Sequence, residues 1–102
     1  MEKRRPHYDL SKIQSVVADP DSRPFTVTAL RGGLALGLLE PEMREVVLAL
    51  NRRDFFKSMT TYTDSKEWQD VYYGKMPAGV AVYIKITYFS DDRPPIIQFK
   101  GK

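Results

Sequence analysis

The sequence predicts an α+β fold, with helices packed on one face of an antiparallel sheet. Two observations carry this prediction. Apolar residues recur every three or four positions in the first half of the chain, whereas apolar and polar residues alternate after residue 54. At 102 residues the chain can build one hydrophobic core, so a single domain is expected over residues 1–102, with residues 1–7 forming a basic N-terminal arm.

Two amphipathic helices are expected in the first half. The first follows Asp9, a suitable N-cap, and ends before Pro20, which cannot continue a helix. The second begins near Pro41, which suits a first helical turn, and is followed at residues 51–54 by a turn with the residues of a capping box. Each helix carries one apolar stripe, which indicates that both pack on a core.

The segment between these helices is less regular. Residues 25–28 favour a short strand, and a helix is expected over about residues 28–37. The pair Gly32 and Gly33 weakens this helix, since each glycine costs about 1 kcal/mol relative to alanine.

The second half predicts three strands, at residues 68–73, 80–89 and 96–100, with a turn at residues 91–95. Neighbouring residues of a strand point to opposite faces, so the Val, Ile and Phe side chains of the last two strands share one face. This face is expected to pack on the helices. The opposite face, called the open face below, would then carry four polar side chains: Tyr83, Lys85, Gln98 and Lys100.

Composition excludes several kinds of catalytic site. The chain has no cysteine and one histidine, which excludes disulfides, thiol chemistry, cysteine zinc sites and multi-histidine metal sites. We therefore expect no metal and no cofactor, and chemistry carried by Lys, Arg, Tyr, Gln, Ser or Thr. His7 lies in the N-terminal arm and is left out of the expected catalytic set. No apolar run is long enough for a membrane span or a signal peptide, so a cytoplasmic location is expected.

Residues 54–70 combine aromatic, basic, hydroxyl and amide side chains more closely than core packing alone requires. We expect this segment to place Lys57 and Gln69 opposite Tyr83 and Lys100 of the C-terminal half. A net charge of +3 is compatible with a polyanionic partner. From the residues alone, three functions stay open: an RNA-cleaving enzyme, a non-catalytic RNA-binding or ribosome-associated module, and an interaction domain that pairs a sheet edge with a partner strand.

A family resemblance rests on five segments that occur in order, over nearly the whole chain and at matching length. They are residues 1–7, 54–64, 68–72, 83–87 and 99–100, and they include the strings KSMTTY and WQDVY. With these segments the chain resembles the MqsR family, the motility quorum-sensing regulator toxins of bacterial toxin–antitoxin pairs.

The resemblance implies a RelE-like α+β fold and a metal-independent, ribosome-independent endoribonuclease that cleaves mRNA at GC-containing triplets such as GCU. It also implies a cognate MqsA-type antitoxin that binds zinc and DNA. DNA would then be contacted only through the antitoxin, and no membrane partner is expected.

The residues that the family ties to RNA cleavage match Lys57, Gln69, Tyr83 and Lys100. Our hypothesis is that Lys57 and Lys100 face each other across the open face, hold the scissile phosphate and stabilise its developing charge. Either lysine could be the general base if its neighbour lowers its pKa. Tyr83 would protonate the leaving oxygen or bind a non-bridging oxygen, and Gln69 would orient the ribose or a base edge.

Four further residues, Phe56, Met59, Tyr73 and Lys85, are expected to bind RNA, the first three by stacking on splayed bases. For Phe56 and Met59, packing in the core is the favoured alternative. Two positions depart from the family pattern, because Phe56 replaces a tyrosine found in relatives and Tyr73 replaces a basic residue.

Overall fold

The computed structural model describes residues 1–61, 66–89 and 95–101. Its elements in chain order are β1 (Glu2–Lys3), α1 (Leu10–Ala18), α2 (Val27–Ala35), α3 (Glu40–Leu48), the 3-10 helix η1 (Arg52–Asp54), β2 (Phe55–Thr60), β3 (Trp68–Lys75), β4 (Ala81–Thr87) and β5 (Ile96–Gly101). The predicted α+β class is therefore confirmed.

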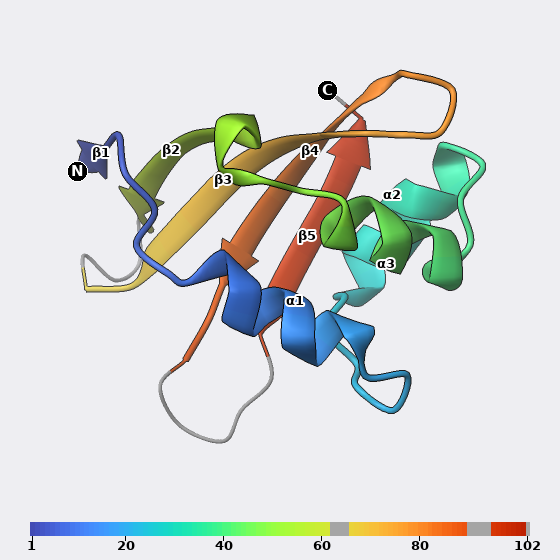
Figure 1. The fold of residues 1–102 in the computed structure, drawn as a ribbon, viewed down its shortest axis with the longest axis horizontal. Coiled ribbons are helices and arrows are strands. Elements are labelled where there is room, and N and C mark those ends of the chain that lie inside the picture. Colours follow the sequence, from blue (N-terminus) through green and yellow to red (C-terminus); the bar gives the residue numbers. More distant parts are fainter. Residues whose placement is uncertain (62–65, 90–94, 102) are drawn as a thin grey trace.

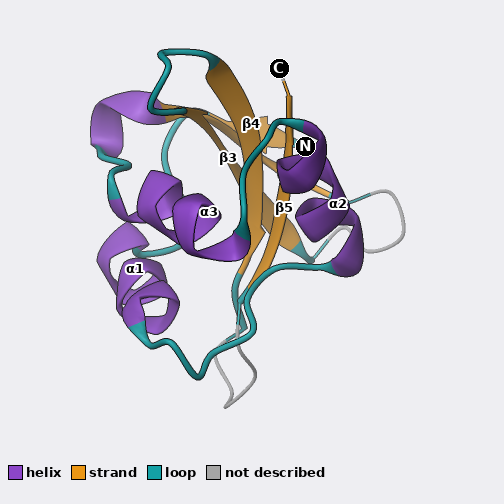
Figure 2. Ribbon diagram, turned by 90° about the vertical axis from the view of Figure 1, so that its right-hand side faces the viewer, coloured by secondary structure: helices purple, strands orange, loops and turns teal. Residues whose placement is uncertain are grey.

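The five strands form one antiparallel sheet in the order β1-β2-β3-β4-β5, so neighbours in sequence are neighbours in space (Figure 1). Figure 2 shows α1 and α3 on one face of this sheet and α2 beside β5. On the opposite face, Tyr83 and Lys85 are half-buried and Gln98 and Lys100 are exposed. This is the open face that strand alternation predicts. Among the described residues, no helix is both long and apolar enough to cross a membrane.

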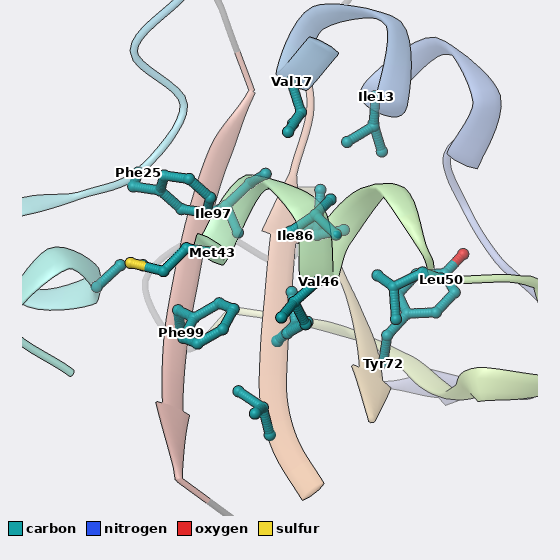
Figure 3. Close-up of a cluster of buried hydrophobic side chains, with 14 of the residues drawn as sticks. Ile13, Val17, Phe25, Met43, Val46, Leu50, Tyr72, Ile86, Ile97 and Phe99 are labelled. Atoms are coloured by element: carbon teal, nitrogen blue, oxygen red, sulfur yellow. The ribbon is translucent and has the colours of Figure 1, made fainter. Parts of the chain in front are cut away.

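The core lies between the helices and the sheet (Figure 3). Ile13 of α1 and Met43 of α3 are fully buried, and they meet side chains of the sheet such as Tyr72, Ile86 and Phe99. The predicted packing of the Val, Ile and Phe side chains of β4 and β5 against the helices is confirmed.

Both predicted helix starts hold in the structure. Asp9 caps α1, because its carboxylate accepts from the Ser11 amide at 3.0 Å. Pro41 lies in the first turn of α3, and Glu42 accepts from the Leu39 amide at 3.0 Å. The expected capping box of η1 also forms, since the Asn51 amide donates to the Asp54 carboxylate.

The prediction for residues 25–28 is largely wrong. Only Phe25 pairs with the sheet, through an isolated bridge to Ile97, and α2 already begins at Val27 with Thr26 as its N-cap. The helix expected over about residues 28–37 is confirmed with small shifts at its ends, and the glycine pair lets it approach the sheet closely. A β-carbon on Gly32 would lie 2.3 Å from the Phe99 carbonyl oxygen, so glycine is what lets α2 lie directly against β5.

The predicted strands are found with small shifts at their ends, as β3 reaches Lys75 and β4 is shorter than expected. The expected turn at residues 91–95 lies outside the described residues except for Pro95. Tyr62 and Asp64 of the family segment 54–64 also lie outside them.

The N-terminal arm is held against the sheet, which the sequence did not predict. Asp70 of β3 is fully buried and accepts hydrogen bonds from the backbone amides of His7 and Tyr8 at 2.9–3.0 Å. The Tyr8 hydroxyl donates to the Trp68 carbonyl at 2.7 Å. These contacts bring the chain end to the edge of the sheet, where β1 pairs with β2.

Candidate active site

Tyr83 lies at the centre of the open face. Its cross-strand partners are Tyr73 on β3 and Lys100 on β5. The Lys100 ammonium lies 5.2 Å from the centre of the Tyr83 ring, the Lys85 ammonium 5.9 Å, and the Tyr73 ring centre 5.8 Å. Burial raises the pKa of the Tyr83 phenol above its ordinary value, although nearby Lys57 partly offsets this shift. Tyr83 is therefore a protonated phenol among cations at neutral pH.

Lys57 reaches the open face because β2 is irregular. The pairing of β2 with β3 shifts register between Phe55 and Lys57. In a regular strand these two residues would share a face. Here Phe55 packs against the core, and Lys57 pairs with Val71, the neighbour of Lys85. The irregularity thus moves a cation to the same side of the sheet as Tyr83.

Glu2 of β1 fixes the charge of Lys57. The Lys57 ammonium lies 2.8 Å from the Glu2 carboxylate and 5.3 Å from the Phe56 ring centre. The hydrogen bond to Glu2 raises the pKa of Lys57 above its ordinary value, which favours the charged form further. Lys57 is suited to binding phosphate and poorly suited to accepting a proton.

The expected pairing of Lys57 with Lys100 takes a different form in the structure. Both lie on the open face, but β3 and β4 separate their strands, so their backbones are about 14 Å apart at three strand spacings. Lys85 on β4 lies between them. Its pKa is lowered by burial first and then by the charges of Lys100 and Lys57. The lysine with the depressed pKa is therefore Lys85, to which we had assigned RNA binding only.

Gln69 lies on the same face, one cross-strand row away from Lys57. It pairs with Met59 on β2, and its amide nitrogen lies 3.5 Å from the Thr87 hydroxyl oxygen. The four residues matched to the family are thus on one face, with Tyr83 and Lys100 in direct contact and with Lys57 and Gln69 towards the β2 side.

The aromatic residues of this face are available to a ligand. Phe56 is 38% exposed, and its ring centre lies 5.1 Å from that of Tyr73. The Arg4 guanidinium lies 5.7 Å from the Phe56 ring centre. Neither Phe56 nor Met59 belongs to the hydrophobic core, so the core-packing interpretation of these two residues is wrong.

His7 lies on the other side of the sheet, with the Asp70 carboxylate that its amide contacts. Its ring stacks on Trp68 at 5.3 Å between centroids, and the Lys3 ammonium lies 2.8 Å from His7 Nδ1. Burial and Lys3 lower the pKa of His7, against a smaller opposing effect of Asp70. These contacts tie the arm to β3.

Two features of the site escaped the sequence reasoning. Glu2 stands in a two-residue strand, too short to show any alternation. Lys85 was placed on the open face correctly, but its central position follows from the order of the strands. Among residues 1–61, 66–89 and 95–101, no group of three or more His, Cys, Asp and Glu side chains could hold a metal ion.

Comparison with known proteins identifies the family of the chain. A family model described as "Motility quorum-sensing regulator, toxin of MqsA" matches residues 5–101. The mRNA interferase toxin MqsR of Escherichia coli (strain K12) is 43% identical over 102 residues, which covers 100% of both chains. The chain therefore belongs to the motility quorum-sensing regulator family, the toxins of MqsA.

Proposed function

We propose that this protein is an mRNA interferase, an endoribonuclease toxin held in check by an MqsA-type antitoxin. The observation that carries the proposal is the grouping of Lys57, Lys85 and Lys100 around Tyr83 on the open face. The 43% identical relative named an mRNA interferase toxin supports it. An mRNA substrate implies action in the cytoplasm.

Cleavage of RNA without a metal requires that the 2′-hydroxyl lose a proton, that the crowded phosphate be stabilised, and that the 5′-oxygen gain a proton. Lys57 and Lys100 supply fixed positive charge near the phosphate. Lysines are cationic at neutral pH, and the ion pair with Glu2 holds the Lys57 ammonium in position before the substrate arrives. Charges already oriented towards the transition state cost no reorganisation during the reaction.

Tyr83 is suited to give a proton to the leaving 5′-oxygen, since its raised pKa keeps the phenol protonated. Gln69 can donate to and accept from the ribose or a base edge without titrating. Phe56 and Tyr73 offer adjoining rings on which unstacked bases can lie. Met59 stands on β2, the strand that carries Phe56.

The sequence preference of the enzyme is proposed to be for GC-containing triplets such as GCU, with cleavage independent of ribosomes and metal ions. The proposed antitoxin binds zinc and DNA, so that contact with DNA occurs only through the complex. Induction of the toxin should arrest growth, and co-expression of the antitoxin should relieve the arrest.

The test uses a short RNA with one GCU triplet, incubated with purified protein in EDTA. Single alanine substitutions of Lys57, Gln69, Tyr83 and Lys100 should each slow cleavage, whereas Lys12→Ala on α1 should not. Loss of wild-type cleavage in EDTA would disprove metal independence. RNA that is bound but never shortened would identify a non-catalytic RNA-binding module, which the same basic and aromatic face could also serve.

A further inference from the structure

We propose that Lys85 is the general base, the group that removes the proton from the 2′-hydroxyl of the RNA. This inference rests on the proposed ribonuclease function. It assigns to Lys85 the general-base role that the sequence left open between Lys57 and Lys100.

The position of Lys85 is the first argument. It lies on β4, in the row that runs from Lys57 through Val71 and Lys85 to Gln98. Lys85 pairs with Gln98 on β5, and Lys100 is two residues beyond Gln98 on the same face. In this diagonal arrangement the β-carbons of Lys85 and Lys100 are within about 7–8 Å of each other. A phosphate bound between Lys57 and Lys100 would lie over Lys85, with the neighbouring ribose hydroxyl within reach of its amine.

The second argument is that the other two lysines are less suited to the role. Lys57 is ion-paired with Glu2, which favours its charged form. Lys100 is exposed at the last strand of the sheet, whereas Lys85 is half-buried on an inner one. A lysine must lose its proton before it can accept another, and burial among cations is the setting that promotes this loss.

The groups around Lys85 are consistent with a depressed pKa. The titratable side chains that face it are Lys57 from β2, Tyr73 from β3, Lys100 from β5 and Tyr83 from its own strand. Among the described residues no carboxylate lies within 4.0 Å of its ammonium, and the Glu2 carboxylate is occupied by Lys57. The pKa of Lys85 is accordingly lowered, by burial first and then by Lys100 and Lys57.

The reaction step then balances. The neutral Lys85 amine takes the 2′-hydroxyl proton as the 2′-oxygen forms its bond to phosphorus. The bond between phosphorus and the 5′-oxygen breaks, and the Tyr83 phenol gives its proton to that oxygen. The products are a 2′,3′-cyclic phosphate and a 5′-hydroxyl end. Exchange with water returns the Lys85 ammonium to the amine and the Tyr83 phenolate to the phenol.

The test compares charge-conserving variants. Arginine keeps the positive charge but does not deprotonate in proteins, so it can replace a phosphate-binding lysine and cannot replace a base. Cleavage of the GCU RNA is measured for the wild type, Lys85→Arg, Lys57→Arg and the control Lys12→Arg. Binding is measured with the same RNA carrying a 2′-deoxyribose at the cleavage site. Loss of a general base should slow cleavage about 100- to 10,000-fold.

A second variant guards against a simple packing effect of arginine. Because the chain contains no cysteine, Lys85→Cys creates a single thiol that bromoethylamine converts to a lysine analogue with a sulfur in its side chain. The sulfur withdraws electrons and makes the amine more acidic. The unmodified thiol variant should be inactive, and the alkylated protein should recover cleavage with its pH–rate profile displaced to lower pH.

Two results would together support the assignment. Lys85→Arg should lose cleavage with unchanged RNA binding, and its loss should exceed that of Lys57→Arg at least tenfold while Lys12→Arg cleaves like the wild type. The alkylated variant should show the displaced profile. Cleavage by Lys85→Arg within threefold of wild type would overturn the assignment of Lys85 but not the proposed function. A pH–rate profile that alkylation leaves unchanged would do the same. Absence of any cleavage by the wild type would overturn the proposed function itself.

Discussion

Removal of the Asp70 carboxylate should detach the N-terminal arm from the sheet. Asp70 is fully buried and accepts from two backbone amides, those of His7 and Tyr8, at 2.9–3.0 Å. A hydrogen bond to a charged group contributes about 1.5–3 kcal/mol, so two of them contribute about 3–6 kcal/mol. The released arm can hydrate its amides, so we expect Asp70→Ala to lower the free energy of unfolding by about 3 kcal/mol, near the lower limit.

The measurement is urea unfolding of Asp70→Ala, with Asp70→Asn and Asp21→Ala as comparisons. Asparagine keeps the shape and one acceptor oxygen, so its loss should be smaller, whereas the exposed Asp21 should change stability by less than about 0.5 kcal/mol. Hydrogen exchange at the Tyr8 amide reports the arm directly and should become fast in Asp70→Ala. An unfolding free energy within about 0.5 kcal/mol of wild type, or a Tyr8 amide that stays protected, would refute the reasoning.

Three further perturbations test other contacts. Glu2→Gln removes the carboxylate that raises the pKa of Lys57, so the Lys57 amine should titrate at a lower pH in an NMR titration. An unchanged titration would show that the ion pair does not shift the pKa of Lys57. Gly32→Ala places a β-carbon 2.3 Å from the Phe99 carbonyl oxygen and should lower the free energy of unfolding by about 1–3 kcal/mol. Gly33→Ala meets only the movable Met43 side chain, so its loss of stability should be smaller. Equal losses for the two variants in thermal unfolding would contradict this reasoning. The folded state resists protonation of His7, whereas the unfolded state protonates at its ordinary pKa of 6.5. Stability should therefore be fully present above that pH and fall as the pH drops from it to the lowered folded pKa, and His7→Gln should lose this slope.

Strand alternation was sufficient to predict the outward direction of Tyr83, Lys85 and Lys100. Their strands are long, and only one register buries the Val, Ile and Phe side chains. The sequence did not show how Lys57 joins them, because alternation alone would place Lys57 on the same face as Phe55. The register shift in β2 resolves this conflict, and it depends on pairing with β3 rather than on a local sequence signal.

At residues 25–28 the local sequence signal is clear but predicts the wrong structure. The β-branched Thr and Val residues favour a strand at residues 25–28, and Gly32 and Gly33 weaken the helix that is expected after it, so local preference places the start of α2 too late. Tertiary packing overrides it, because the two glycines let α2 lie against the Phe99 carbonyl on one side and the Met43 side chain on the other. Each glycine costs about 1 kcal/mol in helix propensity, and the close approach buries Ala29 and Gly33 of α2.

The two halves of the candidate site are held by parts of the fold that differ in burial. Tyr83, Lys85 and Lys100 stand on β4 and β5, whose other face is the buried core. Lys57 depends on a register shift and on Glu2, and Glu2 stands in a two-residue strand anchored by the buried Asp70. Substitutions in the arm should therefore change phosphate binding at Lys57 while the sheet stays folded, whereas substitutions under Tyr83 should unfold the protein. The arm is the place where activity can be altered without loss of the fold.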